Sequence, residues 1–397
     1  MSIETDTKEE KYLVYGLTLS YFTRKFTSYC AYKQIPYRLV IESGRNLLSN
    51  KNLQQYHYEG GIPVVVIPKG PNNKTEPMWD TTAMMLYLER KHRDAERSIL
   101  PTHSKTMQFL NFLIEDYSDE WINICAPGTR WNIEENAKHA GLEIAKEIIS
   151  ITGQKTSVTK LASSMGGSFI KGIVADMGYD KNNGEAWISH VLLPWFQLLH
   201  NHFSESKTPF LFGKKPSLAD FAIFGGSSAH FVNDPSNRKL CDEHAIELIA
   251  HTNRLLEGHH YKMEDPIPPS FGNWLSVEET LASPTLFAII KHIGEYYLPW
   301  AAKACDKKLG EKVHVPFGAQ VPATAFFRQS RAVMLARYIK LRSPELDEYL
   351  SNAGVLQYFS NFVNNAAPPE FLSYFEPPRP VNNRSMNAKV SINVSNL

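Results

Sequence analysis

The first hundred residues alternate between short apolar runs and helix-like segments. The clearest strand signal is the Val and Ile run that begins at Ile62. Segments with the wider apolar spacing of helices lie between the runs. The predicted strands are residues 12–17, 37–41 and 62–67, and the predicted helices are residues 22–33, 46–58 and 83–88. This order favours a small mixed sheet covered by helices within residues 12–95.

The pattern changes after a linker at residues 96–105. The segments that follow are long, helical and rich in Leu, Ile, Phe and Trp, and strand-like runs are nearly absent. We therefore expect an all-α domain over residues 106–376, with an extension at residues 240–360. Residues 1–11 are expected to be flexible and residues 377–397 to form a disordered tail. The predicted helices are residues 107–124, 132–152, 185–203, 218–230, 245–256, 285–297 and 324–339.

Composition and charge argue against several classes of protein. The 397 residues include 42 Lys and Arg against 41 Asp and Glu, so the net charge of +1 lacks the basic excess of a nucleic-acid-binding surface. No run approaches the ~20 apolar residues of a membrane-spanning helix. The polar N-terminus lacks the apolar segment of a signal peptide. Four scattered cysteines without a C-x-x-C pair predict free thiols and a cytoplasmic location.

Ser20 stands where the first predicted strand ends and a cationic helix begins. A serine at this position can serve simply as the N-cap of the helix. Its hydroxyl, the free N–H groups and the positive end of the helix dipole can instead hold an anion such as a thiolate. Both interpretations stay open on these residues alone.

Two further positions have the chemistry of a ligand site. Pro63 opens the Val and Ile run. A cis bond before it would turn the backbone of Ile62 toward a peptide-like ligand, whereas a trans bond would make it an ordinary edge proline. Asp80 and Thr81 precede an apolar helix, where they either cap that helix or bind the two charged groups of a zwitterion.

Two polar pairs later in the chain favour structural roles. Ser217 and Asp220 have the S-x-x-D spacing of a capping box before an apolar run, which predicts the start of a buried helix. His244 and His251 lie seven residues apart and share one helical face. A solvated polar face is favoured there over a metal site, and no metal is predicted.

Taken together, these motifs resemble a glutathione transferase. The stretches LSYFTRKFTSYCAYKQIPYRLV, GGIPVVV, WDTTAMMLYLERKH and FLFGKKPSLADFAIFG follow one another in the order of that family, between residue 12 and about residue 230. The resemblance implies an α/β thioredoxin-like N-terminal domain followed by an all-α glutathione-transferase-type C-terminal domain, here with a long helical extension. It also implies a glutathione-binding, dimeric enzyme.

The resemblance implies roles for the residues at the first helix and the third strand. Ser20 falls on the position that contacts the glutathione sulfur, and Tyr15 is the second candidate for that contact. The backbone of Ile62, before Pro63, would pair with the cysteinyl part of glutathione.

The resemblance also assigns the two ends of glutathione. Asp80 and Thr81 fall on the pair that holds the γ-glutamyl end. Two glycines at residues 60–61 replace the basic or amide residues that often precede the proline in the family. This departure leaves Arg45 and Lys51 as the candidates for contact with the glycyl carboxylate.

The activity implied is attack of an activated glutathione thiol on an electrophilic, mostly apolar small molecule, giving conjugation, cleavage or isomerisation. The alternative is a non-enzymatic ligand-binding or protein-interaction module on the same fold. A thiol–disulfide reductase is disfavoured because serine occupies position 20. The expected acceptor-binding residues are Tyr21, Tyr117, Glu120, Trp121, Arg130 and Trp131.

Overall fold

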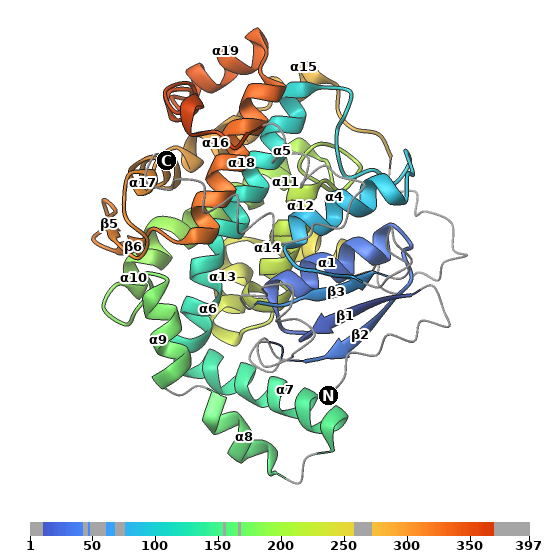
Figure 1. Ribbon diagram of the computed structural model, residues 1–397, viewed down its shortest axis with the longest axis vertical. Helices are drawn as coiled ribbons and strands as arrows, with labels where there is room; N and C mark the ends of the chain where they lie inside the picture. The colour runs from blue at the N-terminus through green and yellow to red at the C-terminus, as the bar shows by residue number, and fades with distance from the viewer. Residues whose placement is uncertain are drawn as a thin grey trace.

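A four-stranded mixed sheet forms the N-terminal part of the molecule (Figure 1). The computed structural model describes residues 11–42, 47, 61–67, 76–153, 156–165, 168–257 and 272–368. The strand order is β2-β1-β3-β4, with β1 parallel to β2 and antiparallel to β3, and β3 antiparallel to β4. The elements are β1 (Tyr12–Gly16), α1 (Tyr21–Tyr32), β2 (Tyr37–Ile41), β3 (Val64–Ile67), β4 (Glu76–Met78) and α4 (Thr81–Lys91).

The two faces of the sheet bury different side chains, because consecutive strand residues point to opposite faces. Tyr12 and Val14 belong to the large core shared with α1 and α4. Leu13 and Tyr15 pack on the other face in a small cluster with Val64. A parallel β1-α1-β2 unit followed by antiparallel β3, β4 and α4 is a thioredoxin-like arrangement, so the predicted fold class is confirmed for this part.

Local differences from the sequence prediction have simple causes. β3 begins at Val64 rather than Ile62, since Pro63 has no N–H to donate to a strand ladder. The short strand β4 was not predicted, because three residues centred on Pro77 carry almost no strand signal. The helix expected at residues 46–58 lies outside the described residues, except for Leu47.

The next part of the chain is helical, as predicted, and is arranged around α5. Its long predicted helices at residues 107–124, 185–203 and 218–230 each continue through one π turn. A π turn inserts one residue into a helix and shifts its apolar spacing, so periodicity alone does not reveal it. The elements are α5 (Lys105–Tyr117), η1 (π, Ser118–Ile122), α6 (Asn123–Asn132), α7 (Glu134–Thr152), α8 (Val158–Met165), α9 (Ser168–Asp176), α10 (Gly184–Trp187), η2 (π, Ile188–Leu192), α11 (Leu193–Ser206), α12 (Leu218–Gly226), η3 (π, Ser227–Phe231), α13 (Pro235–His244) and α14 (Ile246–Glu257).

The capping box before α12 is confirmed. Ser217 Oγ accepts from Asp220 N at 3.3 Å, and Asp220 Oδ2 accepts from Ser217 N at 2.8 Å. The other carboxylate oxygen of Asp220 lies 3.0 Å from His251 Nε2, and His251 is fully buried. The solvated face expected for His251 was therefore wrong: this ring serves the capping carboxylate inside the core.

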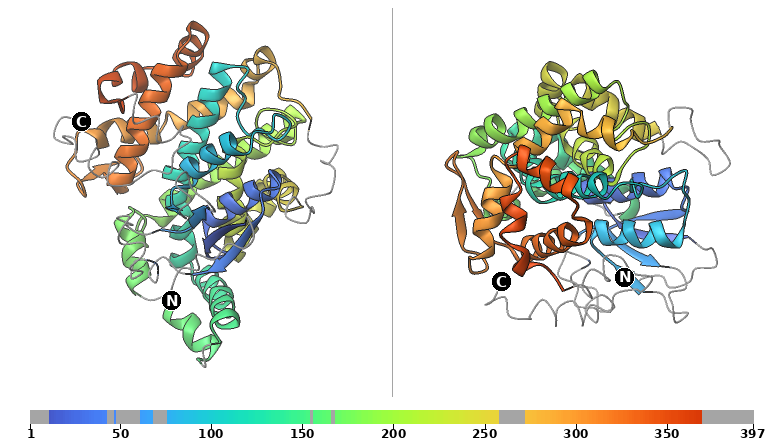
Figure 2. Two further views of the ribbon diagram at one scale, coloured as in Figure 1. Left: turned by 45° about the vertical axis from the view of Figure 1, so that its right-hand side comes forward. Right: turned by 90° about the horizontal axis from the view of Figure 1, so that it is seen from above.

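The extension folds back onto α5, and α18 lies alongside that helix (Figures 1 and 2). Its β5-β6 hairpin was not predicted, because each strand has only three residues. The helix expected at residues 285–297 is divided by a turn after Ile293. The elements are α15 (Val277–Leu281), α16 (Pro284–Ile293), α17 (Tyr297–Cys305), β5 (Lys312–His314), β6 (Gln320–Pro322), α18 (Ala325–Leu341), α19 (Pro344–Asn352), α20 (Gln357–Ser360) and the 3₁₀ turn η5 (Val363–Asn365).

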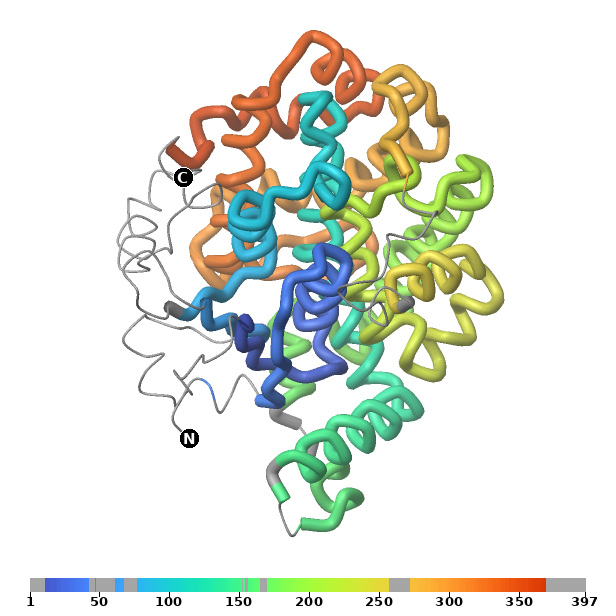
Figure 3. The backbone as a smooth tube through the Cα atoms, turned by 90° about the vertical axis from the view of Figure 1, so that its right-hand side faces the viewer, coloured from blue at the N-terminus to red at the C-terminus, as the bar shows by residue number. Residues whose placement is uncertain are grey.

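Helices α7 and α8 form a hairpin at one end of the molecule (Figure 3). Helix α7 contacts the rest of the molecule at α6, α13 and β2. All four cysteines are free and buried, as expected for a chain with no disulfide pattern. None of the described helices combines the length and apolar character that crossing a lipid bilayer requires.

Candidate functional site

Ser20 ends the loop after β1 and caps α1. Its backbone is extended, with φ −91° and ψ 132°, and its Oγ accepts a long hydrogen bond of 3.4 Å from Thr23 N. The side chain is partly exposed, and it lies at the positive end of the helix dipole. A hydroxyl with one long cap contact can still donate its own proton to an anion.

The helical domain holds the loop that carries Ser20. Both carboxylate oxygens of Glu147, on α7, accept from Thr18 N, at 3.1 and 3.2 Å. Arg130 Nη1, on α6, donates to Leu19 O at 2.8 Å. Hydrogen bonds to charged groups contribute about 1.5–3 kcal/mol each. The position of Ser20 therefore depends on side chains of the helical domain.

The peptide bond between Ile62 and Pro63 is cis, which is the first of the two alternatives considered above. Pro63 is buried and Ile62 is partly buried at the start of the segment that leads into β3. The ladder between β1 and β3 begins only at Val64, opposite Tyr15. Ile62 thus lies outside this ladder.

Asp80 begins α4 in a strained backbone conformation. Its φ of 81° and ψ of 103° lie in a region that non-glycine residues avoid, at a cost of about 1–3 kcal/mol. Its carboxylate accepts from Thr82 N at 3.0 Å and from Ala83 N at 3.3 Å. Asp80 is exposed, whereas Thr81 is buried. The conformation presents a capping carboxylate at an open helix end.

A cavity of about 500 Å³ lies between the N-terminal domain, α5 with η1 and α6, and the extension. Ligand pockets commonly have volumes of about 300–1,000 Å³. Four of the residues predicted to hold glutathione line it: Ile62, Pro63, Asp80 and Thr81. Ser20 does not line the cavity. The other lining residues are Phe22, Gly61, Trp79, Thr82, Glu115, Asp116, Asp119, Glu120, Asn123, Ile124, Met177, Trp300, Val321, Pro322, Thr324, Phe326, Phe327, Gln329, Ser330, Val333 and Arg337.

Beside the cavity, one buried lysine joins its own helix to three other elements. Lys25 Nζ, on α1, forms a 2.6 Å ion pair with Glu115 and a second ion pair with Asp119, and lies 3.3 Å from Thr82 Oγ1. Burial opposes the charge of Lys25, yet the two carboxylates raise its pKa above the ordinary value. Burial likewise opposes the charge of Glu115, but Lys25 and Arg337 lower its pKa overall. The second carboxyl, Asp119, shares the same cation, and burial raises its pKa.

Asp116 and Glu120 differ sharply in their partners. Tyr297 Oη donates to Asp116 Oδ2 at 2.5 Å, and Ser330 Oγ donates to the other oxygen. Within the described part of the chain, the Glu120 carboxyl has neither a hydrogen bond nor an ion pair. Burial, together with the neighbouring carboxylates of Asp116 and Asp119, raises the pKa of Glu120 well above its usual range.

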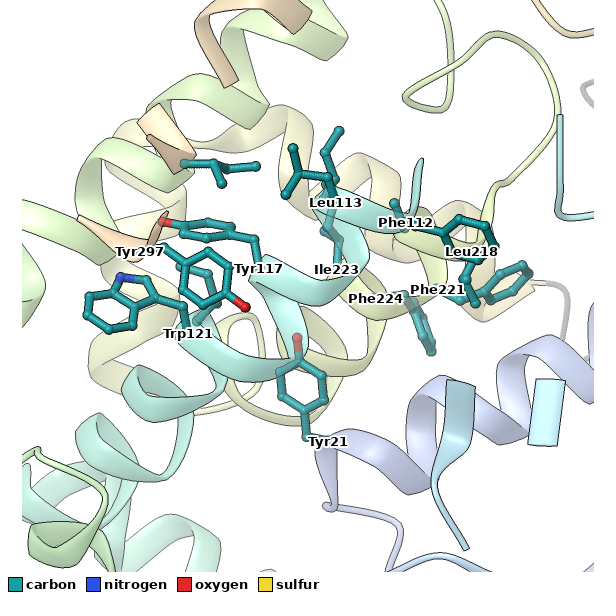
Figure 4. Packing of buried hydrophobic residues seen from close by; sticks show 14 of the residues in the cluster. Tyr21, Phe112, Leu113, Tyr117, Trp121, Leu218, Phe221, Ile223, Phe224 and Tyr297 are labelled. Carbon is teal, nitrogen blue, oxygen red and sulfur yellow. The ribbon is translucent and has the colours of Figure 1, made fainter. Parts of the chain in front are cut away.

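Several residues predicted from the sequence lie inside the core instead of along the cavity. Tyr117 Oη lies 3.1 Å from His292 Nε2, and Trp121 is fully buried against Trp300. Figure 4 shows Tyr117, Trp121 and Tyr297 gathered in one aromatic cluster. Tyr21 points from α1 toward this region, where its hydroxyl donates to a backbone carbonyl of η1.

The remaining predicted residues are also placed outside the lining. Arg130 forms a buried ion pair of 2.9 Å with Asp234. Trp131 is buried in the core, and Tyr15 lies on the face of the sheet away from α1. Two further candidates, Arg45 and Lys51, lie outside the described residues. Of the six residues predicted to bind the acceptor, the cavity lining includes Glu120 alone.

Sequence reasoning missed the wall that the extension contributes. Phe326 and Phe327 are adjacent on α18, where Phe326 is 58% exposed and Phe327 is buried. Two successive aromatic residues on a helix are a weak signal that one of them faces something other than the core. No pattern in the sequence indicates that this segment lines a cavity together with the N-terminal domain.

Comparison with protein-family models gives no match, and neither does comparison with curated proteins. Among solved structures, the chain is similar to a glutathione transferase family member from Pseudomonas fluorescens Pf-5 with two glutathione bound. The identity is 15%, over 63% of this chain and 92% of that chain, with a TM-score of 0.37. It is also similar to glutathione S-transferase III in its apo form, at 14% identity over 65% and 100% of the two chains, with a TM-score of 0.41. A third is a glutathione S-transferase from Rhodospirillum rubrum F11, at 15% identity over 68% and 98%, with a TM-score of 0.39. Likenesses this distant carry no conclusion about activity.

Proposed function

We propose that this protein is a glutathione-dependent transferase, or a related lyase or isomerase, that acts on electrophilic, mostly apolar small molecules. The supporting observation is the composition of the cavity. The N-terminal domain lines it with Ile62, Pro63, Asp80 and Thr81, and the extension lines it with apolar and aromatic side chains. A single cavity therefore combines polar groups suited to a peptide with a surface suited to an apolar acceptor.

The residues on the N-terminal side fit the groups of glutathione. The exposed carboxylate of Asp80 would attract the ammonium of the γ-glutamyl end, while the Thr81 hydroxyl and the start of α4 would favour its carboxylate. Ile62 lies outside the β1-β3 ladder and would offer its backbone to the cysteinyl part.

The chemistry that glutathione supplies is a thiol whose anion is a strong nucleophile. Lowering a thiol pKa by ~2 units requires about 2.7 kcal/mol. A hydrogen bond from Ser20 to a charged sulfur would contribute about 1.5–3 kcal/mol. The end of the α1 dipole would add about 0.3–1 kcal/mol. These two contributions are of the size that thiol activation needs.

A second candidate is a ligand-binding module without thiol activation. The observation in its favour is that Ser20 does not line the cavity. In that case the same groups would bind glutathione or a similar peptide, and no turnover would follow. A thiol–disulfide reductase finds no support, because burial raises the pKa of the Cys30 thiol well above its ordinary value.

The test is to measure the pKa of the bound glutathione thiol from thiolate absorbance in wild-type protein and in Ser20→Ala. We expect a lowered thiol pKa in the wild type and a rise of about 1–2 units in the variant, with binding retained. The matched control is Ser104→Ala, which removes another N-cap hydroxyl, one that accepts from Met107 N at 3.1 Å. An unchanged thiol pKa in Ser20→Ala would reject the role of Ser20 and favour Tyr15 or the binding module.

We also propose that the protein is cytoplasmic and forms a homodimer. Light scattering of the purified chain checks the association state, with a mass twice the 45.1 kDa of one chain as the expected result. A single-chain mass would remove the dimer from the proposal and leave the cavity untouched.

A further inference from the structure

Glu120 differs from every other carboxyl group of the cavity. Asp80 accepts two N–H groups of α4, Glu115 and Asp119 share Lys25, and Asp116 accepts two hydroxyl groups. Glu120, on the π turn η1, also lines the cavity, yet its carboxyl has no hydrogen-bond or ion-pair partner within the described ranges. The other carboxyls have structural partners, and this one is left to a ligand or solvent.

The charges around Glu120 favour its neutral form. Its acidic neighbours come from three elements: Asp80 from the start of α4, Glu115 and Asp116 from α5, and Asp119 from η1 itself. The nearby cations are engaged elsewhere, since Lys25 of α1 pairs with two carboxylates, and Arg337 of α18 lies 3.9 Å over the ring of Phe112. Among the described residues, Tyr297 of α17 and Arg331 of α18 are further titratable groups near this edge of the cavity, and both act on Asp116.

We propose that Glu120 is the proton donor for acceptors that become anionic on oxygen when a thiolate adds to them, as apolar α,β-unsaturated carbonyl compounds do. The inference rests on the proposed glutathione-dependent function. Its basis is the position of an unpartnered carboxyl among Asp116, Asp119 and the apolar wall of the extension. The elevated pKa described above agrees with this role, because a general acid must hold its proton at the working pH.

The addition transfers one proton from Glu120 to the acceptor. A thiolate sulfur forms a bond to the β-carbon of the acceptor, and the electron pair of the carbon–carbon double bond moves toward the carbonyl oxygen. That oxygen takes the proton of the Glu120 carboxyl, which leaves the carboxylate form of Glu120 and an enol. The enol converts to the saturated carbonyl product, and water returns a proton to Glu120. No oxidant or reductant takes part.

The apolar wall of the extension would bind the apolar body of the acceptor. Trp300, Val333 and Phe326 line the cavity on the extension side. Burying an apolar chain against them contributes about 25 cal/mol per Å² of surface removed from water. An acceptor with a hydrocarbon or aromatic body and one carbonyl oxygen therefore matches both sides of the cavity.

The test compares two acceptors in wild-type protein and in Glu120→Gln. An enal such as trans-2-nonenal needs a proton on oxygen, whereas 1-chloro-2,4-dinitrobenzene releases chloride and needs none. General acid catalysis typically contributes a factor of about 10²–10⁴. We therefore expect Glu120→Gln to lose about a hundredfold in kcat/KM with the enal. The loss in kcat/KM with the aryl chloride should be smaller by a factor of at least about ten. The matched control is Glu143→Gln, at an exposed glutamate of α7 that pairs with Lys146.

A second readout uses the unliganded chain. Infrared difference spectra between wild type and Glu120→Gln at neutral pH should contain the carbonyl band of one protonated carboxylic acid, which Glu143→Gln should not remove. Absence of that band overturns the inference. Equal losses of kcat/KM on both acceptors in Glu120→Gln, when the wild type turns both over, also overturn the inference. They leave the proposed function standing. A wild type that neither binds glutathione nor turns over either acceptor overturns the proposed function, and the inference with it.

Discussion

At the scale of single residues, Asp80 combines a strained backbone conformation with a place on the cavity lining. Its φ of 81° is retained although it costs about 1–3 kcal/mol. The conformation lets one carboxylate cap α4 and still border the cavity. A capping role alone would not need an exposed aspartate in this conformation, since serine caps several other helices here with ordinary extended backbones.

Asp80→Asn separates the two roles of this residue. Asparagine caps helices about as well as aspartate, so the free energy of unfolding should change by less than about 0.5 kcal/mol. The lost charge should weaken glutathione binding about tenfold, measured by calorimetry. Asp94→Asn is the control, because Asp94 also accepts two backbone N–H groups but lies outside the cavity. Equal affinities in all three proteins would remove Asp80 from the binding site.

The protonation of Glu120 has a consequence for stability. Its pKa is raised in the folded state, so the folded state holds this proton more tightly than the unfolded chain, whose value is about 4.3. The stabilisation is fully present below that pH and is lost as pH rises through the folded pKa.

Urea unfolding at pH 5 and pH 8 measures this effect. Between these values the wild type should lose more stability than Glu120→Gln, by up to about 1.4 kcal/mol per pH unit, because glutamine has no proton to lose. Asp116 and Asp119 are present in both proteins, so their contributions cancel in the comparison. Parallel stability curves would show that Glu120 titrates as an ordinary glutamate.

At the scale of elements, Lys25 fixes α1 against the helical domain. Its ammonium lies between Glu115 of α5 and Asp119 of η1 and is fully buried. Arg130 and Glu147 attach the preceding loop to α6 and α7. The start of α1 is therefore set by tertiary contacts, and the local sequence supplies only the cap.

Lys25→Met should destabilise the protein by about 3–5 kcal/mol, because it leaves two buried carboxyls without their cation. The measurement is denaturant unfolding at neutral pH. Lys138→Met serves as the control, since Lys138 forms an exposed pair with Glu134 on one helix, for which less than about 0.5 kcal/mol is expected. A loss in Lys25→Met no larger than the control's would mean that the buried network does not hold α1.

At the scale of the whole molecule, the extension forms one wall of the cavity that the N-terminal domain and α5 also line. Helix α18 packs beside α5 and carries Phe326 and Phe327 to the cavity. The extension is therefore part of the site as well as of the core, which distinguishes this chain from a protein whose extra helices lie on the surface.

Of the two adjacent phenylalanines, Phe327 packs in the core and Phe326 is exposed at the cavity. Phe327 is 2% exposed and its ring centroid lies 4.1 Å from that of Trp300, so Phe327→Ala should cost about 3–5 kcal/mol of stability. Phe326 is 58% exposed, so Phe326→Ala should change stability by less than about 0.5 kcal/mol and raise the KM for an apolar acceptor several-fold. Thermal unfolding and acceptor kinetics on the two variants check this. A Phe326→Ala protein with unaltered KM would mean that the extension does not contact the acceptor.

Sequence reasoning predicted most of the fold, because its signals are local. The strand run after Pro63, the cap at Ser20 and the box at Ser217 and Asp220 depend on neighbours within a few residues. The cavity wall that the extension forms depends on contacts between residues about two hundred positions apart. No periodicity predicts that Tyr117 and Trp121 turn into an aromatic core while α18 supplies the wall. The π turn η1 adds to the difficulty, since it shifts which residues of this helix face the cavity.

Every prediction about activity depends on the binding of glutathione in this cavity. We would measure it by calorimetric titration of the full chain with reduced glutathione. We predict saturable binding with one glutathione per chain and a dissociation constant in the micromolar to low-millimolar range. No measurable heat of binding up to several millimolar would contradict it, and would mean that the fold serves a different ligand.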